Sequence, residues 1–332
     1  MVTPLDRRAV LAGAAAMAAT GARAQGASTA QGASTAQGSS TQPAPTIPGP
    51  DPNLRIPSFK LPPRTCDTHT HIFGPHAQYP YADKRPYTPP DAGLAAFRAM
   101  HDTLGIARAV IVNATVHGFD NRVVTDAIAQ SGGRYLGVAN VNERMTDREL
   151  AALDAAGIRG CRFTFLARLG GRPDLSELER LAPRLAALGW HVDLYVEAPA
   201  LPELIPVFSR LPLPYVLDHM CVAKASDGLD QPGFKALVDL ARRDEKCWVK
   251  LTGAERVSAT GAPFRDAVPF ARALVEAAPD RVLWGTDWPH PNVPTMPNDG
   301  DLVDLVPLYA PDEAIRHKLL VDNPAKLYRF PA

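Results

Sequence analysis

The 332-residue sequence predicts an α/β fold, a (β/α)8 TIM barrel, in a single domain. Three observations lead to this prediction. Short apolar or β-branched runs alternate with helical patterns from about residue 60, which is typical of a parallel sheet. Eight such runs occur within residues 61–332, close to the ~250 residues that a closed barrel takes. A doubly wound open sheet would carry a Gly-rich phosphate loop after its first strand, and this sequence has none there.

The eight predicted strands are short and are separated by helical stretches. They are expected at residues 64–68, 109–113, 135–141, 158–163, 191–196, 215–217, 248–251 and 282–285. Among the helices, Thr146 and Glu149 form a capping box that begins one. Another begins at Ser176 and ends at Gly189, a residue type that often terminates helices.

Residues 1–24 have the pattern of an export signal. Arg7-Arg8 precede the apolar stretch 9–20, and Ala22-Arg23-Ala24 offers the small residues of a cleavage site before Gln25. The apolar stretch is too short to span a bilayer. We therefore expect a twin-arginine signal peptide and a periplasmic mature protein. The alternative is a basic N-terminus without a targeting role.

Residues 25–60 are predicted to be a disordered linker. The hexamer Gln-Gly-Ala-Ser-Thr-Ala occurs at 25–30 and again at 31–36, and a Pro-rich stretch follows at 43–52. Such segments cannot bury enough apolar surface to offset the entropy lost on ordering. The barrel is therefore expected over residues 61–332.

The charge and cysteine content restrict the partners and the redox state. Lys plus Arg equals Asp plus Glu, at 35 each, so the chain lacks the electrostatic footprint of a nucleic-acid or membrane-surface partner. No segment after the signal has the length and apolarity of a membrane span. The cysteines lie in or beside apolar strand-like runs and are expected to be buried free thiols, although an oxidising compartment would allow disulfides. They are Cys66, Cys161, Cys221 and Cys247.

Reactive side chains follow several predicted strands, and in a barrel of this class functional residues gather at the carboxyl ends of strands. The first strand runs into His69-Thr70-His71, whose two-residue spacing directs both imidazoles to one face, with Asp67 in the same phase. His219 follows the sixth strand and Asp287 the eighth. These four side chains, His69, His71, His219 and Asp287, are the predicted catalytic residues.

These motifs resemble the amidohydrolase superfamily, in which His-x-His, a later His and an Asp occupy such strand ends. Four segments resemble the 2-pyrone-4,6-dicarboxylate lactonases more narrowly: His71-Ile72-Phe73-Gly74-Pro75, Arg159-Gly160-Cys161-Arg162-Phe163, Asp218-His219-Met220 and Gly285-Thr286-Asp287-Trp288-Pro289-His290-Pro291-Asn292. The similarity covers residues 62–330. It implies hydrolysis of a lactone on an amidohydrolase-type barrel, without an obligatory metal.

The residues at the fourth and fifth strand ends bear on the metal. Many relatives hold divalent metals with His-x-His, a bridging carboxylate or carboxylated lysine, two further histidines and an Asp. Here the fourth strand ends in Arg162, whose guanidinium would repel a cation, and the fifth ends in Tyr195 and Glu197. We therefore expect no metal cofactor. The alternative is a single zinc bound by His69, His71, His219 and Asp287.

Without a metal, the three histidines would polarise the ester carbonyl and stabilise the oxyanion as it forms. Asp287 would take a proton from the attacking water as general base. An ordinary carboxyl group titrates near pH 4 and is therefore ionised at neutral pH. His290, in the loop after the eighth strand, is expected to make a structural hydrogen bond instead.

Arginines at the predicted barrel mouth indicate a small anionic substrate. Arg162 and Arg168 follow the fourth strand and Arg256 the seventh, and a guanidinium binds a carboxylate with two hydrogen bonds. Surface salt bridges are the alternative, especially for Arg168. The resemblance implies that arginines and neighbouring donors hold the substrate carboxylates. The further predicted substrate-binding residues are Tyr87, Tyr195 and His117.

One departure from the lactonase pattern concerns the substrate. Where that family reads His-Met-Gly-Arg-Pro, residues 219–223 read His-Met-Cys-Val-Ala, so an arginine is missing at Val222. The predicted substrate is a carboxylated lactone such as 2-pyrone-4,6-dicarboxylate. Alternatives are sulfomuconolactone or a sugar-acid lactone, a zinc-dependent decarboxylase of the same superfamily, and an exported dicarboxylate-binding protein. A related lactone isomerase lacks the first His of His-x-His and carries Asn in place of Asp287, so the sequence favours hydrolysis over isomerisation.

Overall fold

The computed structural model describes residues 44–169 and 174–330. The predicted signal peptide and the predicted linker up to residue 43 lie outside the described residues. Eight parallel strands form one sheet in which each strand pairs with the next along the chain. The strands are β1 (Cys66–Thr70), β2 (Arg108–Val112), β3 (Tyr135–Ala139), β4 (Ile158–Thr164), β5 (His191–Tyr195), β6 (Tyr215–Leu217), β7 (Cys247–Lys250) and β8 (Val282–Leu283). All eight lie where the sequence predicts strands.

Backbone hydrogen bonds join the first strand to the segment around the last one. Thr68 N donates to Trp284 O (3.0 Å) and Asp287 N donates to His69 O (2.8 Å). Gly285 makes this approach feasible, since a Cβ at that position would lie 2.7 Å from His69 N. The predicted (β/α)8 barrel is therefore confirmed.

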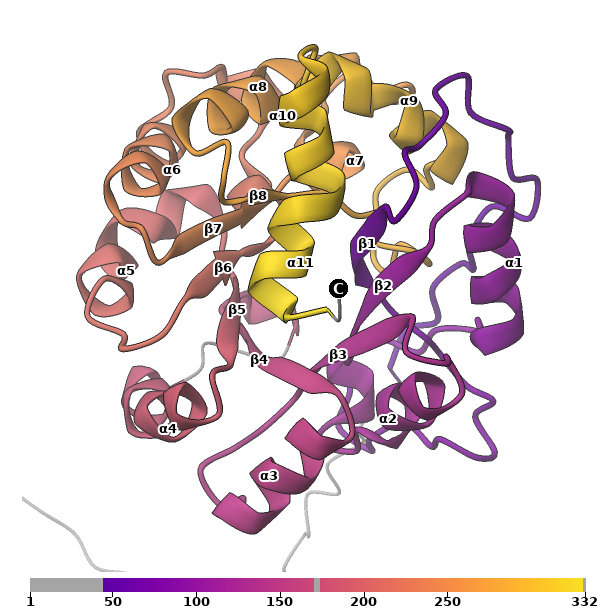
Figure 1. Ribbon diagram of the computed structural model, residues 1–332, viewed down its shortest axis with the longest axis vertical. Helices are drawn as coiled ribbons and strands as arrows, with labels where there is room; N and C mark the ends of the chain where they lie inside the picture. Colours follow the sequence, from indigo (N-terminus) through magenta and orange to yellow (C-terminus); the bar gives the residue numbers. More distant parts are fainter. Residues whose placement is uncertain (1–43, 170–173, 331–332) are drawn as a thin grey trace, which may run out of the picture. The chain divides into compact units, whose positions relative to one another are not determined.

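Helices surround the sheet (Figure 1). They are α1 (Leu94–Leu104), α2 (Arg122–Ala129), α3 (Asp147–Ala155), α4 (Leu175–Ala187), α5 (Leu201–Phe208), α6 (Pro232–Arg243), α7 (Ala254–Val257), α8 (Val268–Ala277), α9 (Asp299–Tyr309), α10 (Glu313–His317) and α11 (Asn323–Tyr328). The longer helices bury one apolar face against the strands, as the 3.6-residue period of their apolar positions requires. None of the helices in the described residues has the length and apolarity needed to cross a membrane.

The predicted helix ends agree with the structure to within two residues. Thr146 Oγ1 accepts from Glu149 N (3.3 Å) and Glu149 Oε2 accepts from Thr146 N (2.7 Å), which is the predicted capping box. Gly189 follows α4 with a left-handed φ of 67°. The start of α4 differs slightly, because Asp174 rather than Ser176 caps it by accepting from Ser176 N (2.9 Å).

Residues 44–60 lie against the barrel, although the sequence analysis assigned them to the linker. Thr46 forms a β-bridge with Thr88. Arg55 forms ion pairs with Asp301 (2.6 Å) and Asp304 (2.7 Å) of α9. The structure therefore differs from the predicted disorder over this stretch, because polar contacts with α9 and the packing of Ile47, Leu54 and Phe59 against the core hold the segment.

The C-terminal segment covers the amino-terminal end of the barrel, and Figure 1 shows α11 passing over its centre. Tyr328 is fully buried, and its ring centroid lies 5.0 Å from that of His191, the first residue of β5. The guanidinium of Arg108, the first residue of β2, lies 4.9 Å from the ring centroid of Phe330. Because this end is sealed, a site inside the barrel has to open at the carboxyl ends of the strands.

The four cysteines are buried and free, as predicted. Burial raises the pKa of each of the four thiols above its ordinary value. A thiol in such an apolar setting is a poor nucleophile and a poor metal ligand. The cysteines are therefore packing residues.

Candidate active site

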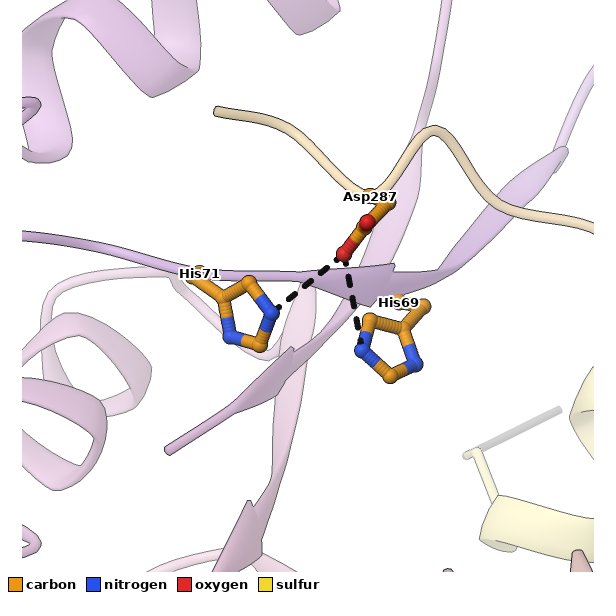
Figure 2. A group of neighbouring side chains, drawn as sticks. All are labelled: His69, His71 and Asp287. Atoms are coloured by element: carbon orange, nitrogen blue, oxygen red, sulfur yellow. Dashed lines mark ion pairs between the residues drawn. The ribbon is translucent and has the colours of Figure 1, made fainter. Parts of the chain in front are cut away.

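The structure brings both histidines of the first strand to Asp287 at the carboxyl end of the barrel (Figure 2). His71 Nε2 lies 3.3 Å from Asp287 Oδ1, and His69 Nε2 lies 3.7 Å from the same oxygen. The other nitrogen of His71, Nδ1, lies 2.7 Å from Val112 O, which can only accept a hydrogen bond. His71 Nδ1 therefore carries a proton.

Asp67, expected in phase with the two histidines, lies outside this group. The pairing register of β1 shifts between Asp67 and Thr70, which changes the alternation of side chains. Asp67 Oδ2 accepts from Thr286 Oγ1 (2.6 Å) and lies 3.3 Å from His101 Nε2 of α1. Asp67 thus ties β1 to the segment after β8 and to a surrounding helix.

Asp287 follows β8 and is tightly paired with Arg256. Its Oδ2 atom accepts from Arg256 Nη2 (2.6 Å) and Nε (3.1 Å). Burial works against ionisation of this carboxyl group, but Arg256 and the nearby histidines outweigh it, and the pKa of Asp287 falls well below its ordinary value. Asp287 is therefore a carboxylate at neutral pH, with Oδ1 facing the histidines.

His219 enters the site from an unusual turn, η4 (Asp218–Val222), directly after β6. Residues 219–222 all have left-handed φ values between 50° and 53°. Non-glycine residues adopt this conformation at a cost of about 1–2 kcal/mol each. The turn places the His219 ring centroid 4.6 Å from that of His69, with Nδ1 2.7 Å from Thr252 Oγ1. Burial lowers the pKa of His219 well below its ordinary value, so its ring is neutral.

A narrow pocket opens beside these residues. Its lining includes eight of the ten predicted site residues, while His69 lies fully buried and His117 lies elsewhere. The eight are His71, Tyr87, Arg162, Arg168, Tyr195, His219, Arg256 and Asp287. The pocket thus combines a carboxylate and imidazoles with arginine and tyrosine side chains.

The arginines in this lining differ in their surroundings. Arg162 is buried, with its guanidinium carbon 4.8 Å from the ring centroid of Tyr195. Arg168 is about half exposed, lies 3.9 Å from Glu197, and its Nη2 atom donates to Tyr195 Oη (3.4 Å). Arg256 is committed to Asp287. Arg162 and Arg168 therefore retain more donor capacity for an anionic ligand than Arg256 does.

His117 does not line the pocket. It ends η1 (Thr115–His117), where its Nε2 atom lies 3.3 Å from Ile72 O and its ring stacks on Phe73 at 6.1 Å between centroids. Thr115, two residues earlier, lines the pocket instead. His290 makes the predicted structural hydrogen bond, with Nε2 3.0 Å from Asp299 Oδ1.

Beneath the histidines lies a buried charged layer that the sequence analysis did not include. Lys250 of β7 lies 2.5 Å from Asp193 Oδ2 and 3.2 Å from Asp218 Oδ1. Arg162 Nε donates to Asp218 Oδ2 (2.9 Å). One signal was present in the sequence: Lys250 interrupts an apolar strand, and Asp193 shares the inward phase of Tyr195 on β5.

Two groups of side chains at the site could hold a metal ion. His69, His71 and Asp287 form one, and His69, Asp218 and His219 form the other, with ligand atoms within 4.8 Å of one another. Imidazole and carboxylate are the ligands that zinc prefers besides thiolate. The adjoining side chains are cationic, however. Arg256 occupies one oxygen of Asp287, and Lys250 Nζ lies 3.2 Å from His69 Nδ1. The donor atoms are present, but the charges around them oppose a divalent cation.

Comparison with known proteins places these residues in context. Residues 66–330 match the sequence profile of the amidohydrolase family. A 2-pyrone-4,6-dicarboxylate hydrolase of Comamonas testosteroni is 48% identical over 285 residues, which cover 83% of this chain and 93% of that protein. A 4-sulfomuconolactone hydrolase of Rhizobium radiobacter is 46% identical over 275 residues, covering 82% and 92% respectively. An apo crystal structure from Agrobacterium tumefaciens is 30% identical with a TM-score of 0.74, covering 83% of this chain and 99% of that one.

Proposed function

Because this chain belongs to the amidohydrolase family, we propose that it is a lactonase, a carboxylic ester hydrolase that opens a small carboxylated lactone. Relatives at 48% and 46% identity are named as hydrolases of a pyrone dicarboxylate and of a sulfonated lactone. One observation carries the proposal: the ionised carboxylate of Asp287, the imidazoles of His71 and His219 and two arginines with spare donors face one pocket. We propose 2-pyrone-4,6-dicarboxylate as the substrate, with sulfomuconolactone or a sugar-acid lactone as alternatives.

In the proposed reaction Asp287 acts on the attacking water. Its Oδ1 atom has no hydrogen-bond partner among the described residues, whereas Oδ2 is held by Arg256. Proton transfer to Oδ1 accompanies bond formation between the water oxygen and the lactone carbonyl carbon. Collapse of the tetrahedral oxyanion then breaks the ring C–O bond, and the proton passes to the departing oxygen. The product carries a new hydroxyl group and a new carboxylic acid, which releases its proton to solvent and becomes a carboxylate.

The sequence predicted that His71 polarises the ester carbonyl. Its contacts suit it instead to orient the attacking water. Since its Nδ1 proton is engaged by Val112 O, His71 without a second ring proton would present the lone pair of Nε2 towards Asp287 Oδ1, 3.3 Å away. A water molecule that donates one hydrogen to each atom satisfies both acceptors. His69 and His219 then remain as the groups that stabilise the oxyanion.

Arg162 and Arg168, with Tyr87 and Tyr195, would bind the carboxylates of the substrate. The arginine of the lactonase pattern that is missing at Val222 is replaced by an apolar wall, in which Val222 clusters with Leu166 and Tyr195. A substrate carboxylate near Arg256 would also compete with Asp287 for the guanidinium. That competition raises the basicity of Asp287 at the moment it is needed.

We further propose that the reaction needs no resident metal. In the buried layer and at the pocket floor, Lys250, Arg162 and Arg256 pair with Asp193, Asp218 and Asp287. Glu255, 3.3 Å from Arg256, is also buried, and burial raises its pKa. A divalent ion would add two uncompensated charges to this low-dielectric region. The alternative is a zinc-dependent hydrolase or decarboxylase using the donor groups described above, for which zinc would supply Lewis-acid polarisation.

The test is an absorbance assay on protein beginning at Gln25 and dialysed against a chelator. Rapid loss of the pyrone chromophore of 2-pyrone-4,6-dicarboxylate is expected without added metal. Loss only after zinc addition would favour the zinc alternative. If the protein opens other anionic lactones but not the pyrone, one of those lactones is the substrate. If it binds the pyrone tightly and the ligand is recovered unchanged, the protein is a binding protein.

We also propose that the enzyme is exported to the periplasm, on the basis of Arg7-Arg8, the apolar stretch 9–20 and the small residues before Gln25. In a cell-fractionation experiment the protein should appear in the periplasmic fraction with Gln25 as its first residue by mass spectrometry. Replacing Arg7 and Arg8 by lysine should retain the precursor in the cytoplasm. If the lysine variant reached the periplasm to the same extent as the unaltered protein, the predicted twin-arginine signal would be refuted.

A further inference from the structure

Lys250 is a fully buried cation at the carboxyl end of β7 that the proposed reaction does not use directly. A buried ammonium is costly unless acceptors surround it. Lys250 Nζ hydrogen-bonds Asp193 Oδ2 and His69 Nδ1, the latter at 3.2 Å, and pairs with Asp218 Oδ1 at 3.2 Å. Its three N–H groups thus face three potential acceptors, one of which belongs to a candidate catalytic histidine.

The contact between Lys250 and His69 has a direct consequence for the imidazole. An ammonium group has three donors and no lone pair, so it can bind His69 Nδ1 only when that nitrogen is unprotonated. Asp218 Oδ1 competes for the same nitrogen, because it lies 3.3 Å from Nδ1 and would accept a proton placed there. That arrangement would point an N–H group at the ammonium and lose one hydrogen bond of Lys250.

We infer that Lys250 is a positioning residue: by donating to His69 Nδ1 it fixes the tautomer in which Nε2 carries the proton and faces the reaction centre. The surroundings of the other ring nitrogen agree with this. His69 Nε2 is buried, has no hydrogen-bond partner among the described residues and lies 3.7 Å from Asp287 Oδ1, so a proton there would face the reaction centre without being engaged by another group.

This inference rests on the proposed lactonase function for its catalytic meaning. A neutral His69 with the opposite tautomer would present a lone pair to the developing oxyanion and repel it. With the proton on Nε2, the same ring donates a hydrogen bond that strengthens as negative charge develops. Lys250 thus acts on the reaction through His69, without touching the substrate.

The first test is the tautomer itself, measured on the full chain with imidazole-¹⁵N-labelled histidine by long-range ¹H–¹⁵N correlation at pH 7. The His69 signals are identified by their loss in the His69→Asn variant. We expect an unprotonated Nδ1 and a protonated Nε2. A proton on Nδ1 in the unaltered protein would overturn the inference, whether or not the protein opens lactones.

The second test removes the ammonium while keeping the charge of the buried layer balanced. The double variant Lys250→Met with Asp193→Asn loses one cation and one anion, and the single variant Asp193→Asn is its matched control. We expect Asp193→Asn to keep the Nε2 proton. In the double variant the proton should move to Nδ1, which then donates to Asp218, and kcat should fall on the order of 100-fold, the effect of losing one oxyanion donor, with little change in KM.

The outcomes separate this inference from the proposed function. Persistence of the Nε2 proton in the folded double variant, checked by circular dichroism, would show that Lys250 does not set the tautomer. Unchanged kcat despite a moved proton would remove His69 as an oxyanion donor while leaving the lactonase activity in place. If no lactone is opened by the unaltered protein, the proposed function fails, and the ¹⁵N measurement still decides the tautomer.

Discussion

Arg256 donates two hydrogen bonds to a single oxygen of Asp287, from Nη2 at 2.6 Å and from Nε at 3.1 Å. The two residues follow adjacent strands, β7 and β8, so the pair spans neighbouring strand ends of the barrel. The sequence suggested that Arg256 serves the substrate. In the structure its first partner is the candidate general base, and the two roles are therefore coupled.

Replacing Arg256 by methionine should shift the pH dependence of activity. Arg256 is the largest influence that lowers the pKa of Asp287, and burial acts in the opposite direction. Without the guanidinium the pKa rises, so the carboxylate is protonated, and activity lost, at a higher pH than in the unaltered enzyme. The measurement is kcat/KM against pH, and the acid limb should move upwards. Arg168→Met is the control, and it should raise KM without moving the acid limb. If the acid limb of Arg256→Met also stays in place, Arg256 does not control the ionisation of Asp287.

Asp287→Asn should abolish turnover while largely preserving ligand binding. An amide cannot accept the proton of the attacking water, and loss of a general base costs about 10²–10⁴-fold in rate. Arg162 and Arg168, which would hold the substrate carboxylates, are not altered. Steady-state kinetics gives kcat, and calorimetric titration with the dicarboxylate gives Kd. Equal losses in kcat and in affinity would contradict the assignment of Asp287 as base.

Gly253→Ala should lower both stability and kcat. Gly253 has a φ of 75°, and a Cβ there would lie 3.1 Å from the Cβ and Nδ1 atoms of His219. Gly105→Ala is a matched control, since Gly105, which follows α1, is also left-handed, with a φ of 78° and a ψ of 28°, and no atom lies within 4 Å of the added Cβ. The control should cost about 1–2 kcal/mol of unfolding free energy for the backbone conformation alone. In urea unfolding Gly253→Ala should cost more, and only Gly253→Ala should reduce kcat; equal effects on kcat would refute the contact with His219.

Tyr328→Ala should destabilise the barrel without a specific effect on the site. The Tyr328 side chain is fully buried at the sealed end of the barrel, where it packs near His191. Truncation of a large buried aromatic side chain costs about 3–5 kcal/mol. Phe119, which is 55% exposed, is the control, and its truncation should change the unfolding free energy by less than about 0.5 kcal/mol. A loss below about 1 kcal/mol for Tyr328→Ala would show that the C-terminal segment contributes little to the seal.

The strands were predictable from the sequence because their signals are local. Apolar runs, capping residues and terminating glycines lie within a few positions of the elements they define, as Thr146 and Gly189 illustrate. The gathering of His71, His219 and Asp287 followed from the rule that strand ends of a barrel share one face. Residues 44–60 could not be placed in this way, since their contacts with Asp301 and Asp304 connect positions about 250 residues apart.

The remaining differences at the site have a common origin in side-chain direction. A strand-end position gives the height of a residue in the barrel but not the way it points, so His117 was assigned to the pocket although its ring turns towards Phe73. A register shift inside β1, which no residue type signals, directs Asp67 away from the histidines. Lys250 was not predicted as a site residue because its partners come from three other strands or strand ends.

The hydrogen bonds between β1 and the segment after β8 determine when the site can form during synthesis and folding. The backbone partners Thr68 and Trp284 are 216 positions apart, and His69 of β1 and His71 after it meet Asp287 only when these two ends of the sheet join. Contacts of such high sequence separation form slowly, since the entropy of closing the loop is lost before they are gained. A chain emerging from the ribosome therefore carries both histidines through most of its synthesis before Asp287 exists. The site therefore needs a closed barrel, and chains in which β1 and the segment after β8 have not joined lack it.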